Sequence, residues 1–303
     1  MTAFLFPGQG SQAPGMGADL FEASPEARAV FDEADAVLGV SLTSLMFGDD
    51  AEALKPTEIT QPALFTHSLA ADAVLRARGL RPDVAAGHSL GEWSALAATG
   101  AVTFADGLRA VRRRGELMAQ ARSGAMSAVL GLDAAALESA CREATEAGEG
   151  VVVPANYNDP GQIVISGDAE AVARAGALCT AAGAKRVVPL PVSGAFHSPL
   201  MAPARDAFAE TLDSLTITAP ACPVVLNVTA EPTQDPDEIR ARLLEQLTAP
   251  VRWAQSLERM AALGATRYVE VGTGAVLSGL VRRTLGRDAQ TAPAGTADQI
   301  AAL

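Results

Sequence analysis

The chain has 303 residues, which allows two domains of about 150 residues each or one large domain that carries an insertion. Its 23 Lys and Arg residues against 35 Asp and Glu residues give a net charge of −12, which argues against a nucleic-acid-binding protein. No apolar stretch approaches the ~20 residues of a membrane span. The first ten residues, MTAFLFPGQG, lack the basic segment of a signal peptide. We therefore expect a cytoplasmic protein with no membrane association.

Short apolar runs alternate with helical patterns along the chain, as is typical of α/β proteins. In the first part we expect strands at 3–6 and 84–86, and helices at 25–38, 60–78, 91–98 and from 103 onward. Ser24, Thr60 and Thr103 are the predicted N-caps of three of these helices. In the last part we expect a helix after 198–199, a strand at 224–228, helices at 237–247 and 252–263, a strand at 268–271 and a last helix from 275.

The middle segment has a different order of elements. We expect strands at 125–132, 151–154, 162–166 and 186–190, with a helix at 133–147 that is capped by Asp133 and a second helix at 169–182. A turn-rich Asn-Tyr-Asn-Asp-Pro-Gly sequence separates the second and third strands. The order βαββαβ is that of a ferredoxin-like fold. The sequence thus predicts a small ferredoxin-like domain at 124–192, inserted into a large α/β-hydrolase-like domain made of 1–123 and 193–303.

A candidate nucleophile lies in Gly87-His88-Ser89-Leu90-Gly91, which matches the pattern G-x-S-x-G between a strand and a helix. In a nucleophile elbow the glycines allow a sharp turn, and the serine lies at a helix N-terminus that favours developing negative charge. The alternative is a tight strand–helix turn that is merely capped by Ser89.

A serine nucleophile needs a base, and the chain has only three histidines. His88 adjoins Ser89 and should point away from it, while His67 lies inside a predicted helix. By elimination, His197 in the loop before Ser198-Pro199 is the candidate base. The alternative is a histidine on a surface loop. Because no acid has an obvious place between Ser89 and His197, a backbone carbonyl could orient the base, which favours a Ser–His dyad over a triad.

Backbone N–H groups could stabilise an oxyanion beside this serine. Leu90, directly after Ser89, would supply one donor, and the segment Pro7–Gln12 after the first strand would supply the other. That segment is Gly-rich, but it matches neither a P-loop nor the pattern G-x-G-x-x-G.

Three consecutive arginines, Arg112, Arg113 and Arg114, cannot share one face of a helix. At least one is expected to point inward, where a buried guanidinium needs an anion such as a substrate carboxylate. The alternative is a solvated basic stretch. Three widely spaced cysteines, Cys141, Cys179 and Cys222, resemble small buried hydrophobic residues in a reduced compartment, and no metal site is expected.

These segments together resemble the malonyl-CoA:acyl carrier protein transacylase family, whose catalytic fold also serves in fatty-acid and polyketide synthases. The resemblance covers essentially the whole chain. It rests on PGQGSQ at 7–12, GHSLGE at 87–92, the arginine before Gly115, and GAFHSPLM at 194–201. It implies transfer of a malonyl group from malonyl-CoA to the phosphopantetheine thiol of an acyl carrier protein. No metal or redox cofactor is implied, and a monomer is the default for the family.

The resemblance also assigns roles to individual positions. Ser89 would carry the acyl group as an ester, with His197 as its base. Gln246 matches the residue whose main-chain carbonyl orients that histidine. Gln9 and Leu90 would donate the oxyanion-hole amides, and the arginine that clamps the malonyl carboxylate would be Arg114.

Further positions concern specificity and docking. Phe196 resembles the malonyl-selecting form of its loop, because a ring beside the α-carbon would resist an added methyl group. Asn156 and Asn158 match the loop that lines the cleft between subdomains. Local basic residues would have to dock the acidic carrier protein, and the candidates are Lys185, Arg186, Arg282 and Arg283. Each of these pairs could equally be an ordinary solvated surface.

Two other classes of function share part of this pattern. A serine esterase or thioesterase would have the same elbow and release a free acid. A carrier-protein-binding module without activity would tolerate loss of Ser89 or His197, yet both are present.

Overall fold

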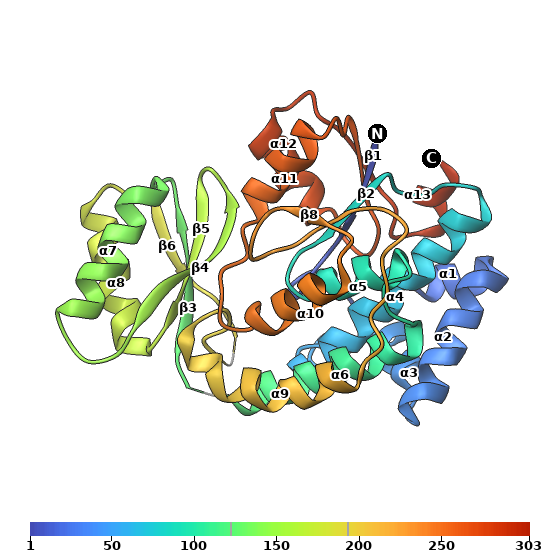
Figure 1. Cartoon of the computed structure of the whole chain (residues 1–303), viewed down its shortest axis with the longest axis horizontal. Helices are drawn as coiled ribbons and strands as arrows, with labels where there is room; N and C mark the ends of the chain where they lie inside the picture. Colours follow the sequence, from blue (N-terminus) through green and yellow to red (C-terminus); the bar gives the residue numbers. More distant parts are fainter. Residues whose placement is uncertain (122, 193) are drawn as a thin grey trace.

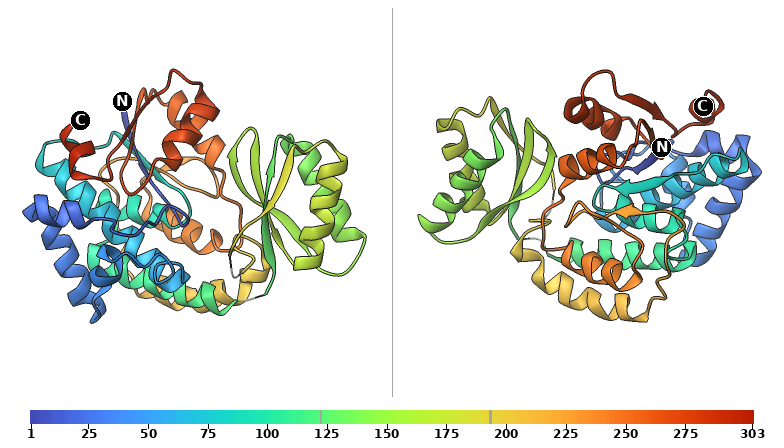
Figure 2. Two further views of the ribbon diagram at one scale, coloured as in Figure 1. Left: turned by 180° about the vertical axis from the view of Figure 1, so that it is seen from behind. Right: turned by 45° about the horizontal axis from the view of Figure 1, so that its top comes forward.

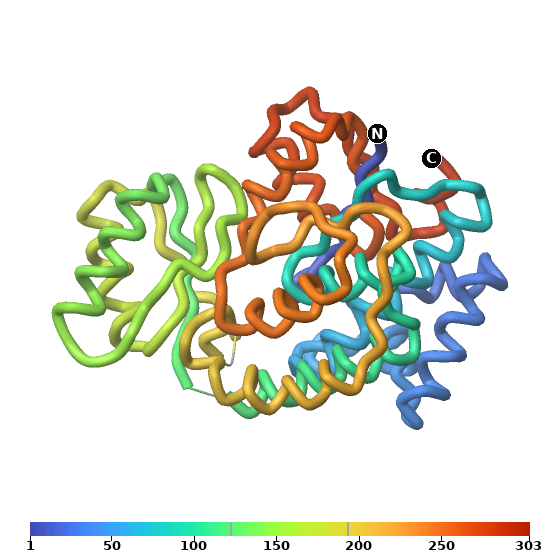
Figure 3. The backbone as a smooth tube through the Cα atoms, viewed as in Figure 1, coloured from blue at the N-terminus to red at the C-terminus, as the bar shows by residue number. Residues whose placement is uncertain are grey.

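The computed structural model describes residues 1–121, 123–192 and 194–303 of the chain. It contains a large lobe around a six-stranded sheet and a small lobe around a four-stranded sheet (Figure 1). Ser193, where the second piece of the large domain was predicted to begin, lies outside the described residues. The chain passes from the large lobe into the small lobe and back again, as the tube in Figure 3 shows.

The large sheet has the strand order β10-β9-β1-β2-β7-β8. Its strands are β1 (Thr2–Phe6), β2 (Val84–Gly87), β7 (Val224–Val225), β8 (Pro232–Thr233), β9 (Arg267–Glu270) and β10 (Gln290–Pro293). β8 runs antiparallel to β7, and the other strands run parallel to their neighbours. The carboxyl ends of β1, β2 and β7 therefore meet at one edge, which is where parallel sheets usually place their sites.

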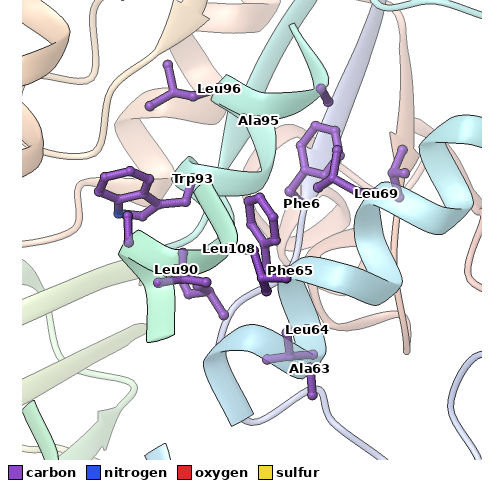
Figure 4. Packing of buried hydrophobic residues seen from close by; sticks show 14 of the residues in the cluster. Phe6, Ala63, Leu64, Phe65, Leu69, Leu90, Trp93, Ala95, Leu96 and Leu108 are labelled. Carbon is purple, nitrogen blue, oxygen red and sulfur yellow. The ribbon is translucent and has the colours of Figure 1, made fainter. Parts of the chain in front are cut away.

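Both faces of this sheet are covered by helices. Phe4 and Phe6 of β1 belong to one buried cluster, and Ala3 and Leu5 belong to another, because successive side chains of a strand point to opposite faces. The first cluster includes residues of α2 (Pro25–Leu38), α4 (Thr57–Ala77), α5 (Gly91–Ala98), α6 (Phe104–Gln120), α9 (Ala202–Ser214) and α10 (Pro236–Glu245). The second includes residues of α11 (Trp253–Ala262) and α12 (Val276–Leu285). Figure 4 shows Trp93 and Leu96 of α5 together with Phe65 of α4 among the residues of the first cluster.

The small lobe has an antiparallel sheet of order β4-β5-β3-β6. It is formed by β3 (Ala125–Leu130), α7 (Ala134–Glu146), β4 (Val152–Asp159), β5 (Gln162–Gly167), α8 (Ala169–Ala181) and β6 (Arg186–Pro189). One sheet face packs on α7 and α8 through residues such as Val129 and Ile165. The opposite face contributes Met126 and Val164 to the core of the large lobe. Figure 2 shows the two helices on the side of the small sheet away from the large lobe.

Several predicted helix starts are confirmed. The side-chain oxygens of Ser24, Thr103 and Asp133 each accept a hydrogen bond from a backbone N–H in the first turn of α2, α6 and α7. The predicted cap Thr60 is wrong. That helix begins at Thr57, directly after Pro56, whose carbonyl accepts from the Thr60 N–H, and the Thr60 hydroxyl donates to the Leu54 carbonyl.

The turn predicted between the second and third strands of the small lobe is confined to Pro160 and Gly161, so its predicted start at Asn156 is wrong. β4 continues to Asp159, with register shifts at Pro154/Asn156 and at Tyr157/Asp159. The backbone of this irregular part has a partner outside its own sheet, since Tyr157 N–H donates to the Val251 carbonyl and Val251 N–H donates to the Ala155 carbonyl. These bonds keep the segment extended, so Asn156 and Asn158 lie in a strand rather than in a loop.

The end of the chain differs from the prediction as well. The helix from 275 is not the last, because β10 extends the parallel sheet and α13 (Ala297–Ala301) follows it. The strand predicted at 224–228 ends at Val225. The short helices α1 (Ala18–Ala23), α3 (Leu42–Phe47) and η1 (Pro199–Met201) complete the fold. Of the described helices, none is both long and apolar enough to span a membrane.

Candidate active site

Ser89 lies in the turn between β2 and α5, at the carboxyl end of the parallel strands. Its φ is 52°, a left-handed conformation that non-glycine residues seldom adopt outside functional sites. The flanking glycines are required by close backbone contacts. A Cβ on Gly87 would lie 1.8 Å from the Gly91 carbonyl oxygen, and a Cβ on Gly91 would lie 2.0 Å from that of Phe6. The pattern G-x-S-x-G thus folds as a tight turn that presents Ser89, here called the Ser89 turn (residues 87–91).

His197 faces this serine from the second half of the chain. Its Nε2 lies 2.8 Å from Ser89 Oγ, and its Nδ1 lies 2.8 Å from the main-chain oxygen of Gln246. His197 is buried and also has a positive φ, 58°. Burial, followed by the positive charge of Arg114, lowers the pKa of His197 to about 3. The imidazole is therefore neutral near pH 7, the state in which Nε2 can accept a proton.

Arg114 is the inward-pointing residue of the arginine run. It is almost fully buried, and its Nη2 donates to Ser89 Oγ at 3.2 Å and to Gln246 Oε1 at 2.9 Å. Its Nη1 donates to Gln61 Oε1 at 2.9 Å. Burial lowers the pKa of Arg114 to about 10, so it remains a cation at neutral pH. Arg112 and Arg113 instead turn outward to Glu116, as ordinary helix-surface pairs.

A cavity of about 120 Å³ opens over these groups. It is lined by Gln9, Gln61, His88, Ser89, Leu90, Arg114, Met118, Met126, Asn156, Leu190, Val192, Phe196 and His197. A cavity of this size can hold ordered water or an acyl group of a few heavy atoms. Within the described residues, the N–H groups of Gln9 and Leu90 have no protein acceptor. Both backbones are therefore free to donate to a ligand.

The small lobe supplies one wall of this site. Asn156 is buried and lines the cavity, whereas Asn158 is buried behind it. The Asn158 Oδ1 lies 2.8 Å from His88 Nε2, and the His88 ring packs 5.4 Å from that of Trp253. His88 thus connects the Ser89 turn to β4, and its Nε2 pairs with Asn158 rather than with Ser89. The third histidine, His67, is buried inside α4.

Three polar residues that the sequence reading did not assign are buried beside Ser89: Gln61, Glu92 and Asn227. Asn227 Oδ1 accepts from the Ser89 N–H at 2.7 Å, and Glu92 Oε2 accepts from the Asn227 N–H at 2.6 Å. Burial raises the pKa of Glu92 to about 7. Asn227 follows the short apolar run of β7, and a polar residue at the carboxyl end of a parallel strand is the signal that could have identified it.

The four candidate docking residues lie on the surface. Lys185 and Arg186 are exposed at the start of β6, and Arg282 and Arg283 are exposed near the end of α12. Arg283 is already engaged, since its Nε lies 2.6 Å from Oδ2 of the buried Asp159 in β4. Arg283 therefore links the large lobe to the small lobe. Of the two arginines, Arg282 is the one more available to bind a partner.

The cysteines take no part in this site. Cys141 and Cys179 are buried in the small lobe, Cys222 is half-buried, and all three are free thiols. Burial raises the pKa of each of them. In the part of the chain that the structure describes, no three His, Cys, Asp or Glu side chains gather as a possible metal site.

The chain is similar to known acyl transferases along nearly its whole length. A family model described as an acyl transferase domain matches residues 3–299. The malonyl CoA-acyl carrier protein transacylase of Bacillus subtilis is 49% identical over 284 residues, which are 93% of this chain and 89% of that protein. The Escherichia coli K12 protein of the same name is 50% identical over 285 residues, 93% of this chain and 92% of that one.

Solved structures of proteins with the same activity in their names have the same fold as this chain. An acyl carrier protein S-malonyltransferase from Vibrio cholerae has a TM-score of 0.96 at 44% identity, covering 99% of both chains. A malonyl-transacylase solved in complex with a type II polyketide synthase acyl-carrier protein has a TM-score of 0.95 at 41% identity, covering 99% of this chain and 97% of that one.

Proposed function

Because the chain belongs to the acyl transferase domain family, we propose that it transfers a malonyl group from malonyl-CoA to the phosphopantetheine thiol of an acyl carrier protein. This reaction supplies extender units for fatty-acid or polyketide synthesis. The observation that carries the proposal is the contact of Ser89 Oγ with both His197 Nε2 and the buried guanidinium of Arg114. A nucleophile thus lies within hydrogen-bond reach of both a base and a carboxylate receptor.

The first half-reaction acylates Ser89. Its Oγ attacks the thioester carbonyl carbon of malonyl-CoA while His197 Nε2 takes the hydroxyl proton. The negative charge on the former carbonyl oxygen is stabilised by the N–H groups of Gln9 and Leu90. Collapse of this intermediate breaks the carbon–sulfur bond, and the proton on His197 passes to the leaving thiolate. The products are coenzyme A and the malonyl ester of Ser89.

The second half-reaction reverses these steps with another thiol. The carrier-protein thiol gives its proton to His197 and attacks the ester carbonyl, and Ser89 leaves and recovers the proton. Throughout, the Nδ1–H of His197 donates to the Gln246 carbonyl, which fixes the tautomer with a free Nε2. Each half-reaction exchanges a thioester and a hydroxyl for an ester and a thiol, or the reverse, with no change of oxidation state, so the proposal includes no cofactor.

Arg114 gives the site its preference for a dicarboxylic acyl group. In the free enzyme its donors are met by neutral acceptors, Gln61 Oε1, Gln246 Oε1 and Ser89 Oγ. The terminal carboxylate of malonyl would replace part of this set with a charge-assisted pair, worth about 2–4 kcal/mol. The added negative charge would also offset the cation that lowers the pKa of His197 and so strengthen the base.

The arrangement of strands and helices supports a two-domain description of the chain. We infer that the small lobe is a ferredoxin-like domain at 124–192, inserted into a large α/β-hydrolase-like domain formed by 1–123 and 193–303. The strand order β4-β5-β3-β6 and the two helices on one face are those of the βαββαβ arrangement. The cavity is lined by residues of both lobes, including Ser89 and Asn156, and so lies between them.

Other residues would select the acyl group and dock the carrier protein. Phe196, which lines the cavity, would disfavour a methyl branch on the acyl group. We propose Lys185, Arg186 and Arg282 as docking residues for the acidic carrier protein. Replacing Lys185 and Arg186 together by Glu should raise the KM for the carrier protein and leave acylation by malonyl-CoA unchanged. We further propose that the protein acts as a cytoplasmic monomer without nucleic-acid or membrane association.

Intact-protein mass spectrometry tests the function directly. The protein is mixed separately with malonyl-CoA, acetyl-CoA and methylmalonyl-CoA, and then with holo carrier protein. We expect a malonyl adduct that Ser89→Ala abolishes and that the carrier protein removes as malonyl-carrier thioester. Absence of any adduct would overturn the proposal, and release of free malonate in place of the thioester would identify a thioesterase.

A further inference from the structure

We propose that Asn227 is a positioning residue, whose carboxamide holds the Ser89 turn in its reactive geometry and is itself anchored by Glu92. This inference rests on the proposed function, because the consequence is measured in the acylation of Ser89. It concerns two buried residues that do not line the cavity and that the roles assigned to Ser89, His197 and Arg114 do not use.

The fold brings Asn227 to the turn. β7 pairs in parallel with β2, so the residues that follow these two strands come together at the same edge of the sheet. Asn227 comes two residues after β7 and is completely buried. It lies 138 positions from Ser89 in the sequence, so nothing local in the chain indicates the contact.

One carboxamide spans the turn. Asn227 Oδ1 accepts from the Ser89 N–H at 2.7 Å, and Asn227 Nδ2 donates to the Gly87 carbonyl at 2.7 Å. The remaining polar group of the Ser89 backbone is bound by a second carboxamide, since Gln246 Nε2 donates to the Ser89 carbonyl at 3.1 Å. Both main-chain polar groups of the proposed nucleophile are therefore bound by side chains that lie far along the chain, and the Ser89 carbonyl also accepts from the Glu92 N–H at 3.1 Å.

This clamp has two consequences for the chemistry. A non-glycine residue at φ 52° is strained and persists only where its surroundings hold it, and these bonds supply that constraint. The clamp also occupies the Ser89 N–H, so that Leu90 N–H is the donor of the turn that remains for a ligand. Release of the clamp would move Ser89 Oγ relative to His197 and would move the Leu90 donor with it.

Glu92 fixes the clamp from the opposite side. It lies in the first turn of α5, is fully buried, and accepts from the Asn227 N–H at 2.6 Å. The main chain of Asn227 is thereby tied to the helix that the Ser89 turn begins. The turn, α5 and the segment after β7 form one closed ring of hydrogen bonds.

Asn227→Leu tests this inference, because leucine has a similar size and no polar atoms. We expect the single-turnover rate constant for acylation by malonyl-CoA to fall about 100-fold, the typical effect of displacing a catalytic group by ~1 Å. The dissociation constant of malonyl-CoA, measured in a Ser89→Ala background, should change less than about threefold, because Arg114 is untouched.

The rate constant is normalised to folded protein, measured by circular dichroism. Thr99→Val is the matched control, since it removes a buried hydroxyl that donates to the Ala95 carbonyl far from the cavity. It should lower the melting temperature without changing the rate constant. If Asn227→Leu also acylates at the wild-type rate per folded molecule, Asn227 is only structural and the inference is overturned.

Asn227→Asp gives a readout that a structural role would not produce. When protonated, the introduced carboxyl can accept from Ser89 N–H and donate to the Gly87 carbonyl, but when ionised it cannot donate. Two ionisable residues bond Asn227 directly, Glu92 through its carboxylate and Arg252 through its main-chain N–H. Two more, Arg114 and His197, bond Gln246, which in turn donates to Asn227 Oδ1. Wild type contains them all, so rates are compared as the ratio of variant to wild type at each pH.

We expect this ratio to rise at least about fivefold between pH 8 and pH 5.5, as the carboxyl gains its proton and the clamp is restored. A ratio that does not vary with pH would contradict the inference. Failure of the proposed function is distinguishable, because wild-type protein would then form no malonyl adduct at all.

Discussion

The main-chain carbonyl of Gln246 lies 2.8 Å from Nδ1 of His197, in the place where a triad would put a carboxylate. A carbonyl selects the same tautomer of the histidine without adding a negative charge to a site that must admit an anionic substrate. The side chain of Gln246 has a separate task, because its Oε1 accepts from Arg114 and its Nε2 donates to the Ser89 carbonyl.

Gln246→Ala separates these two tasks. The variant keeps the carbonyl that orients His197 but removes an acceptor of Arg114 and the donor that binds the Ser89 carbonyl. We expect acylation by malonyl-CoA to fall about tenfold, the effect of one hydrogen bond to a charged group. The pH dependence of the acylation rate should match that of wild type. A displaced pH profile would instead mean that the histidine had lost its orienting partner.

Arg114→Ala tests the carboxylate receptor. Loss of the guanidinium should reduce acylation by malonyl-CoA at least tenfold, because hydrogen bonds to charged groups contribute about 1.5–3 kcal/mol each. Acylation by acetyl-CoA should be unchanged or faster, since the charge that lowers the pKa of His197 is removed. The neighbouring Arg113→Ala, which removes an outward-facing arginine, is the control. Equal losses with both substrates would contradict the assignment.

Phe196→Ser tests the steric selection of the acyl group. The ring lines the cavity, and its removal creates space for a methyl branch. A methyl-sized change is worth ~1–3 kcal/mol, so the ratio of kcat/KM for methylmalonyl-CoA to that for malonyl-CoA should rise roughly 5- to 150-fold. Competition between the two thioesters, followed by mass spectrometry of the adduct, measures this ratio directly. An unchanged ratio would exclude Phe196 as the selecting residue.

His67→Gln tests the pH dependence of stability. His67 is buried, and burial lowers its pKa to about 4 from an ordinary value of 6.5. Between these two pH values the unfolded chain binds a proton at this position that the folded chain does not. Stability therefore falls as the pH falls, by up to about 1.4 kcal/mol for each pH unit from this one group.

Removing His67 should make the decline between pH 6.5 and pH 4.5 less steep. Urea unfolding at several pH values gives the free energy of unfolding for both proteins. His197, which has the same sign of effect, is present in both and cancels in the comparison. Parallel curves for wild type and variant would show that His67 does not contribute.

The residues around Ser89 illustrate what the sequence alone could predict. The elbow was recognisable because its glycines are required by local geometry, and His197 was selected because few histidines compete with it. The role of Gln246 came only from the family resemblance, since a main-chain carbonyl leaves no side-chain signal. Asn227 was missed because its contact with Ser89 depends on which strands pair, and local pattern does not specify strand order.

The same reasoning explains the errors in the fold. The turn predicted at 156–161 has the composition of a loop, but bonds to Val251 keep its first part extended. Those partners lie about 90 residues away, beyond the reach of local propensity. By contrast, the caps at Ser24, Thr103 and Asp133 depend only on neighbours within three residues, and all of them were predicted correctly.

The bonds between β4 and Val251 also restrict how the small lobe can move relative to the large lobe. Ala155 and Tyr157 in the small lobe are tied to Val251, which lies only five residues beyond Gln246. A rotation that widened the cleft would have to break these bonds or pull on the short segment that holds the carbonyl behind His197. Opening of the cleft and the position of the His197 base are therefore coupled through this segment. Access of the thiol to the site and transfer of its proton depend on the same short stretch of backbone.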